Sequence, residues 1–266
     1  MWSGGTSAGS CHSKNTRHTH PRQCEHQLSK ILKILVFSIA IGVAAAAAAQ
    51  QPAGNLGVDL DSRTLSVQAK AEELFERGDY RRAHVIYRND LAPIGDKYAQ
   101  YMLGFMNLSG LGVEQDPVLA SAWYRLAAER GEPEEFVAIR DELLGQLDAV
   151  DRARSEEIYL GLRREYSDIA ISMREAREAF EDLSQVSTGS RLEGPSSAVT
   201  IVEPRAGSSL SGDALIYRQQ RRMQGHLDYI TRALDIDRID AETVTAGELS
   251  DLEEQVRDYN RQSGFR

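Results

Sequence analysis

Two short patterns in the sequence match motifs that carry chemistry in other proteins. Residues 5–9, GTSAG, match the Gly-x-Ser-x-Gly turn that exposes a nucleophilic serine in hydrolases. Gly110-x-Gly112 resembles the start of a dinucleotide-binding loop, but Gln115 replaces the third glycine. Both motifs need a preceding β-strand; the first copy lies in a leader that we expect to be removed, and no strand precedes the second. Neither pattern therefore predicts an active site.

Residues that could hold a metal or form a catalytic triad are scarce. Both cysteines, Cys11 and Cys24, lie in the first 49 residues, and only His84 and His226 remain among histidines after them. A first-row metal site or a serine or cysteine triad needs a richer set of side chains. The many carboxylates follow predicted helix starts and surface faces. We therefore expect no catalytic residue, no metal ligand and no cofactor, and predict that the chain is not an enzyme.

The elements around Gly110 and Gly112 are predicted to be two helices joined by a tight turn. Residues 97–108 are almost continuously apolar, and such a helix is stable only when other elements cover more than one face. Residues 117–130 place apolar side chains at three-to-four spacing, which is typical of an amphipathic helix. Asp116 can cap that helix, and Pro117 suits its first turn. The predicted fold class is all-α.

A weaker copy of this pattern precedes it. Residues 66–77 predict a helix capped near Ser66, with Ala69, Leu74 and Phe75 facing inward. Three positions then recur at an offset of 37 residues, Ala83, Ile86 and Tyr87 in the first copy and Ala120, Trp123 and Tyr124 in the second. This offset is close to the period of solenoids built from helix pairs, in which neighbouring pairs must stack to bury their apolar faces.

The stronger copy resembles the Sel1-like repeat family, relatives of the tetratricopeptide repeat. The resemblance rests on Ala99, Leu103, Gly104, Gly110, Gly112, Val113, Asp116, Ala120, Trp123, Tyr124, Ala127, Ala128 and Gly131. Asn107 departs from the pattern, because the family has a tyrosine there. The resemblance implies a short α-solenoid of helix-turn-helix repeats, and an adaptor or scaffold role in bacterial envelope assemblies.

Stacked helix pairs curve so that their first helices line a groove. Four side chains of the first helix are additional to the family packing positions, and they are Tyr98, Tyr101, Met102 and Phe105. Aromatic side chains recur at binding hot spots, so these four are the predicted partner-binding groove. The alternative is that neighbouring helices simply cover them.

The N-terminal region has the pattern of an export signal. Ile31 to Ala49 is an apolar run that follows Lys30 and ends in small residues, which is typical of a cleaved signal peptide. We expect cleavage near Ala49 and a periplasmic or secreted protein without an integral membrane span; a retained anchor is the alternative. Residues 1–49 are the leader and signal peptide, with 1–30 an extension that a misplaced start codon would also explain, and 50–65 are a flexible entry.

The charge of the chain argues against nucleic-acid binding. The formal net charge is −9, and the leader holds five of the 31 basic residues and one of the 40 acidic ones, which leaves −13 after Ala49. Phosphate binding is driven by positive charge. The chain after Ala49 also lacks cysteine, so its stability must come from helix packing rather than disulfides. We expect a protein or peptide partner.

The C-terminal third divides at a change of composition. Residues 66–184 are the predicted repeat domain, which ends in helices that keep the period but lose the repeat signature. Residues 185–213 are rich in Ser, Gly and Pro and are predicted to be a linker; within it, residues 199–202 are β-prone and either pair with another chain or lie against the solenoid. Residues 214–266 predict two amphipathic helices, the second begun by a capping box of Ser250 and Glu253.

Three functions remain open at this stage. The leading hypothesis is an exported, non-enzymatic scaffold that holds a protein or peptide in its groove. A second is an envelope enzyme or small-ligand binder that acts on cell-wall-derived substrates. A third is self-association through the two C-terminal helices, whose apolar stripes need a partner surface.

Overall fold

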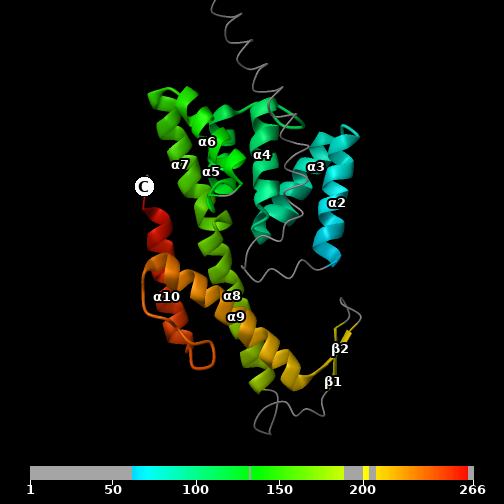
Figure 1. Cartoon of the computed structure of the whole chain (residues 1–266), viewed down its shortest axis with the longest axis vertical. Coiled ribbons are helices and arrows are strands. Elements are labelled where there is room, and N and C mark those ends of the chain that lie inside the picture. The colour runs from blue at the N-terminus through cyan, green and yellow to red at the C-terminus, as the bar shows by residue number, and fades with distance from the viewer. Residues whose placement is uncertain (1–61, 132, 189–199, 204–207, 263–266) are drawn as a thin grey trace, which may run out of the picture. The chain divides into compact units, whose positions relative to one another are not determined.

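The computed structural model describes residues 62–131, 133–188, 200–203 and 208–262, and these residues are mostly helical (Figure 1). The all-α fold class is confirmed. The regular helices are α2 (Ser62–Glu76), α3 (Tyr80–Ile86), α4 (Lys97–Ser109), α5 (Pro117–Ala127), α6 (Glu134–Gln146), α7 (Ala149–Tyr166), α8 (Asp168–Thr188), α9 (Gly212–Leu234) and α10 (Ala246–Arg261). Within the described residues no helix is both long enough and apolar enough to cross a membrane.

The predicted leader and signal peptide lie outside the described residues, as does most of the predicted entry segment. The first described helix, α2, begins at Ser62 rather than near Ser66. No glycine or proline lies between these two serines, so nothing in the sequence delays the helix start. Leu74 is buried as predicted and Phe75 is half-buried, but Ala69 is exposed and Ala71 is buried in its place.

The central hairpin of α4 and α5 begins and ends as the sequence predicts. Asp96 caps α4 by accepting a hydrogen bond from the Ala99 amide at 3.1 Å, and Gly110 ends it with a φ of 69°. Asp116 caps α5 by accepting from the amides of Val118 and Leu119 at 3.0 and 2.9 Å. A cap of this kind stabilises a helix by about 1 kcal/mol.

Close packing between α4 and α5 depends on the small residues of the repeat pattern. A Cβ atom added to Gly104 would lie 2.9 Å from the ring of Tyr124, so only glycine permits this approach. Asn107 is buried, and its side-chain amide donates to the Leu103 carbonyl at 2.7 Å. The other pattern positions that are buried in this hairpin are Ala99, Leu103, Ala120, Trp123, Tyr124, Ala127 and Ala128.

The first copy of the repeat is less regular. The chain leaves α3 through a π-helical turn, η1 (Tyr87–Leu91), and a 3-10 turn, η2 (Ala92–Ile94), and then turns at Gly95 with a φ of 81°. Ala83 and Tyr87 are buried as the repeat offset predicts. A Cβ atom added to Gly112 would lie 2.6 Å from the Arg81 backbone nitrogen, so the hairpin turn packs directly on α3.

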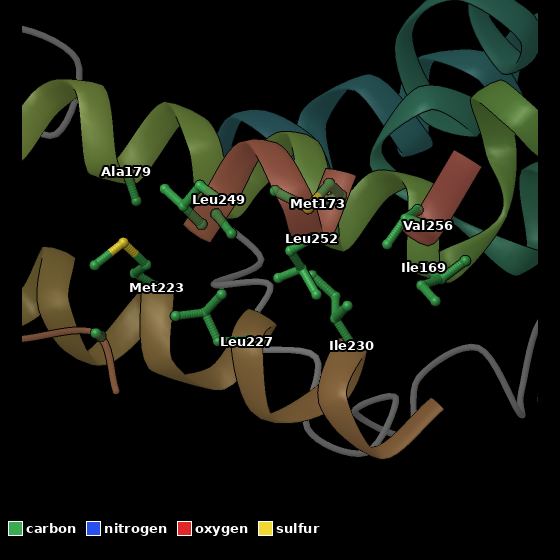
Figure 2. Packing of buried hydrophobic residues seen from close by; sticks show 11 residues of the cluster. Ile169, Met173, Ala179, Met223, Leu227, Ile230, Leu249, Leu252 and Val256 are labelled. Atoms are coloured by element: carbon green, nitrogen blue, oxygen red, sulfur yellow. The ribbon is translucent and has the colours of Figure 1, made fainter. Parts of the chain in front are cut away.

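The C-terminal helices share a core with α8, as Figure 2 shows. Ile169 and Met173 come from α8, and the core residues of the other two helices are Met223, Leu227 and Ile230 in α9 and Leu249, Leu252 and Val256 in α10. A domain boundary at residue 184 therefore falls inside α8, which continues to Thr188. The apolar stripes that suggested self-association are buried within the chain itself, and self-association stays a prediction.

Two details of this region differ from the sequence-based expectation. The segment predicted to be a linker contains an antiparallel hairpin, in which β1 (Thr200–Glu203) pairs with β2 (Ser208–Ser211) in the register Thr200 to Ser211. Its second strand is mostly serine and carries no apolar alternation, so the pattern did not reveal it. The capping box at α10 is formed by Thr245 and Glu248, five residues before the predicted box of Ser250 and Glu253.

Candidate functional site

Helix α4 has one covered side and one side that is only partly covered. Figure 1 shows α5 and α6 on one side of α4, with α3 and α2 on the other. Tyr101 and Met102 are 1% and 5% exposed. The Tyr101 ring stacks on Phe136 of α6 at a centroid distance of 4.6 Å. Phe136 of α6 therefore covers Tyr101, and since both Tyr101 and Met102 are buried, neither offers a surface to a partner.

The other two predicted groove residues, Tyr98 and Phe105, remain half-buried and lie toward α2. The Phe105 ring lies 6.2 Å from the ring of Phe75 in α2. The Gln68 side-chain amide of α2 donates to the Asp96 carboxylate at 2.7 Å. The two helices therefore touch near both ends of a shared surface.

We call this surface the α2–α4 face. Helical spacing of i, i+4, i+7 and i+8 puts the α2 members on one side of that helix, and spacing of i, i+7 does the same for Tyr98 and Phe105 in α4. The members are Gln68, Glu72, Phe75 and Glu76 of α2 and Asp96, Tyr98 and Phe105 at α4.

The π-helical turn η1 packs against both α2 and α4 and places Tyr87 next to this face. The Tyr87 ring lies 6.4 Å from the Tyr98 ring, edge to face. The Tyr87 side chain is only 1% exposed, and its hydroxyl has no hydrogen-bond partner among the described residues. A buried polar group without a partner costs about 1 to 3 kcal/mol, so it is a candidate ligand contact.

The electrostatic field at the α2–α4 face is negative. Burial raises the pKa of Tyr98 to about 12, and the charges of Glu72, Asp96 and Glu76 add to the shift. Burial also raises the pKa of Glu72, and Glu76 and Asp96 raise it further. The same three carboxylates, with burial as the larger cause, raise the pKa of Tyr87. Every charged group that shifts these pKa values is acidic.

Two basic side chains near this face, Lys70 of α2 and Arg77 just after it, pair with another carboxylate. In the described part of the chain, Lys70 and Arg77 both pair with Glu73, at 2.9 Å each. Glu73 lies next to Glu72 in sequence but points away from the face, because consecutive helical residues are about 100° apart. Among the described residues, the donors to the Asp96 carboxylate are neutral, the Gln68 side-chain amide and the Ala99 backbone amide.

On the covered side of α4, by contrast, charges are paired. Lys97 is 8% exposed, and its ammonium group donates to the Leu126 carbonyl at 2.9 Å and to Glu129 at 3.0 Å. It also lies 3.1 Å from a carboxylate oxygen of Asp168, the first residue of α8. Arg130 donates to Asp168 at 2.8 Å and 3.0 Å. This ion cluster, in which Lys97 and Asp168 are buried and Glu129 and Arg130 are half-buried, joins the central repeat to α8.

The ion cluster was not predicted from the sequence. Lys97 is the single charged residue of an otherwise apolar helix, and this was the available signal. Burial raises the pKa of Asp168, but the opposing charges of Lys97 and Arg130 outweigh it and leave the pKa below its ordinary value. Because its charges are paired and wholly or partly buried, we assign the cluster to stability rather than binding.

The two histidines lie apart, on α3 and α9. Burial lowers the pKa of both His84 and His226, which favours their neutral form. Across the residues that the structure describes, no group of three or more His, Cys, Asp or Glu side chains is arranged to hold a metal ion. The α2–α4 face is therefore the candidate site.

Comparison with known proteins identifies the central hairpin. A family model described as the Sel1 repeat matches residues 97–132, which contain α4 and α5. Searches of curated proteins and of solved structures found no match. Sel1 repeats generally mediate protein–protein interactions and typically belong to non-enzymatic scaffolds. The chain therefore contains one recognised Sel1 repeat, formed by α4 and α5.

Proposed function

We propose that this chain is an exported scaffold or adaptor of the bacterial cell envelope that binds a protein partner through the α2–α4 face. One observation carries the choice of surface: Tyr98 and Phe105 are half-buried aromatic rings, and the Tyr98 ring lies 6.4 Å from the ring of Tyr87, whose buried hydroxyl has no hydrogen-bond partner among the described residues. Aromatic rings provide large contact area at low conformational cost, and a bound peptide can supply the missing hydrogen bond.

Export is supported by the sequence alone. The apolar run from Ile31 to Ala49 has the length and the small-residue end of a signal peptide. If the signal is cleaved, mass spectrometry of protein from a periplasmic extract will find a mature N-terminus near Gln50. Full-length chain confined to the cytoplasm would contradict export, and an intact chain in the membrane fraction would favour the anchor.

Selection from a random 12-residue peptide library tests binding directly. The full chain is expressed, the protein is purified in the form that the cell produces, and phage-displayed peptides are selected for binding to it. We expect a set of enriched peptides whose affinity falls at least about tenfold on the double variant Tyr98→Ala/Phe105→Ala, because hot-spot aromatic residues contribute about 2 kcal/mol or more to binding.

A matched control separates binding from folding. Tyr217 of α9 is 65% exposed and lies outside the face, so Tyr217→Ala removes an exposed tyrosine elsewhere. Its peptide affinity should equal that of the wild type. Circular dichroism must show that both variants keep their helical content. Failure to enrich any peptide, or equal binding by the double variant, would contradict the proposed function.

A further inference from the structure

We infer that the partner segment presents a lysine or arginine side chain to Glu72, Glu76 and Asp96 on the α2–α4 face. This inference rests on the proposed function and names the chemistry of its partner. The occupant is a cationic peptide segment. The length of the face, its carboxylates and its aromatic rings favour this occupant.

The face is a bounded surface rather than a run of acidic residues. One boundary is the hydrogen bond between Gln68 and Asp96, and the other is the ring contact between Phe75 and Phe105. Seven residues of α2 separate the two contacts, which is about 10 Å along a helix. Glu72 lies between them, one helical turn from each. This length suits one or two side chains of a bound peptide.

Charge and aromatic groups converge there. Glu72 and Glu76 form no ion pair in the part of the chain that the structure describes, and both are exposed. Burial is the largest cause of the raised pKa of Glu72, Tyr87 and Tyr98, and the neighbouring groups that raise each pKa further are all acidic. A cation placed here would be attracted by carboxylates and also by the faces of the aromatic rings.

The hydroxyl of Tyr87 adds to the argument. The buried hydroxyls of Tyr101 and Tyr124 also lack partners among the described residues, but carboxylates raise the pKa only of Tyr87 among these three. The Tyr87 hydroxyl is buried, it is close enough to Glu72, Glu76 and Asp96 for their charges to affect it, and no described group bonds to it. A phenol oxygen accepts hydrogen bonds from ammonium and guanidinium groups. An anionic segment would instead place its charge among three carboxylates, which is unfavourable.

The test uses the best peptide from the library selection. Its lysine and arginine residues are replaced together by glutamine, and fluorescence anisotropy measures the Kd of both peptides for the wild-type chain. We expect the enriched set to carry basic residues, and the glutamine peptide to bind at least about tenfold more weakly, as for charge-assisted contacts. Raising the salt concentration should weaken only the basic peptide.

Two adjacent glutamates provide a matched pair of variants. Glu72→Gln removes a carboxylate from the face, and Glu73→Gln removes one from the same helix outside it. Neither substitution removes a buried contact, so both variants should fold. We expect the Kd of the basic peptide to rise about three- to tenfold for Glu72→Gln and to stay within about twofold for Glu73→Gln.

The outcomes separate this inference from the proposed function. Enriched peptides that are neutral or acidic, or equal effects of the two glutamate variants, would overturn the cationic partner and leave the binding function intact. An absence of enriched peptides would overturn the binding function itself. Enrichment of basic peptides, together with weaker binding to Glu72→Gln but not to Glu73→Gln, supports both the binding function and the cationic partner.

Discussion

Asp96 and Lys97 are neighbours in sequence at the start of α4, but their side chains enter two different kinds of charged site. Lys97 enters the ion cluster, where Glu129 and Asp168 pair with it. Asp96 faces α2, where the described groups that donate to it are neutral and the nearby charges are also acidic. The start of α4 thus lies between one group of charges that are paired with opposite charges and one group of carboxylates that are not, in the part of the chain that the structure describes.

The difference indicates what each side of α4 does. Buried charges persist in a folded protein only when they are paired, so the ion cluster serves to hold α8 against the central repeat. Like charges on a partly exposed face repel one another and do not stabilise the fold. A face of this kind gains favourable contacts only when a partner of opposite charge binds, so we assign recognition to it.

The largest expected effect comes from breaking the ion cluster. Asp168→Ala removes the carboxylate that pairs with both Lys97 and Arg130, leaving Lys97 only the Glu129 carboxylate among the described residues, and should lower the free energy of unfolding by about 3 to 5 kcal/mol. Urea denaturation measures this. Asp213→Ala, which removes an exposed aspartate from the first turn of α9, should cost less than about 1 kcal/mol.

The pH dependence of stability gives a second readout of this variant. Because the folded state lowers the pKa of Asp168, its contribution is present above the ordinary aspartate pKa and is lost as the pH falls through the lowered value. Asp168→Ala should therefore lose part of the acid sensitivity of the wild type. Equal stability of both aspartate variants would contradict the structural role of the cluster.

A smaller effect is expected where the covered side of α4 meets α5. Gly104→Ala places a methyl group 2.9 Å from the Tyr124 ring and should cost about 1 to 3 kcal/mol. Gly161→Ala in α7 meets no atom within 4 Å and should stabilise the chain by about 0.5 to 1 kcal/mol. We expect the melting temperature to fall for Gly104→Ala and to rise for Gly161→Ala. A rise for both variants would show that the Tyr124 ring can move to accommodate the methyl group.

The smallest effect on stability is expected on the α2–α4 face. Burial, Glu76 and Asp96 raise the pKa of Glu72 in the folded chain, so its charged form is slightly unfavourable. This penalty exists above the raised pKa and disappears as the pH falls below the ordinary glutamate value. Glu72→Gln should therefore leave stability at pH 7 equal or slightly higher, within about 0.5 kcal/mol. A clear loss would assign Glu72 to the fold rather than to binding.

The sequence pattern predicted the fold where local signals agree. Asp116 before Pro117 and glycine at the Gly110 turn mark the hairpin, and the spacing of apolar residues marks α7 to α10. The β1–β2 hairpin and the true start of α10 were not predicted. Serines in β2 carry no periodic signal, and two Thr/Ser-x-x-Glu patterns, at residues 245–248 and 250–253, both match a helix cap.

The candidate site was only half predictable. Apolar character in α4 indicated Tyr98 and Phe105 but also Tyr101, which α6 covers, because the sequence does not say which neighbour lies on which side. Glu72 and Tyr87 could not be assigned to the site from spacing alone. Tyr87 belongs to the irregular turn η1, and Glu72 belongs to α2, which packs near α4. These placements depend on contacts between residues far apart in sequence.

Site-specific photo-crosslinking tests the central claim most directly. Benzoylphenylalanine replaces Tyr98 in one sample and Tyr217 in another, and each protein is irradiated with the same selected peptide. If the α2–α4 face binds the partner, the peptide will be joined to the chain only from position 98. Crosslinking from position 217 alone, or equally from both positions, would contradict the assignment.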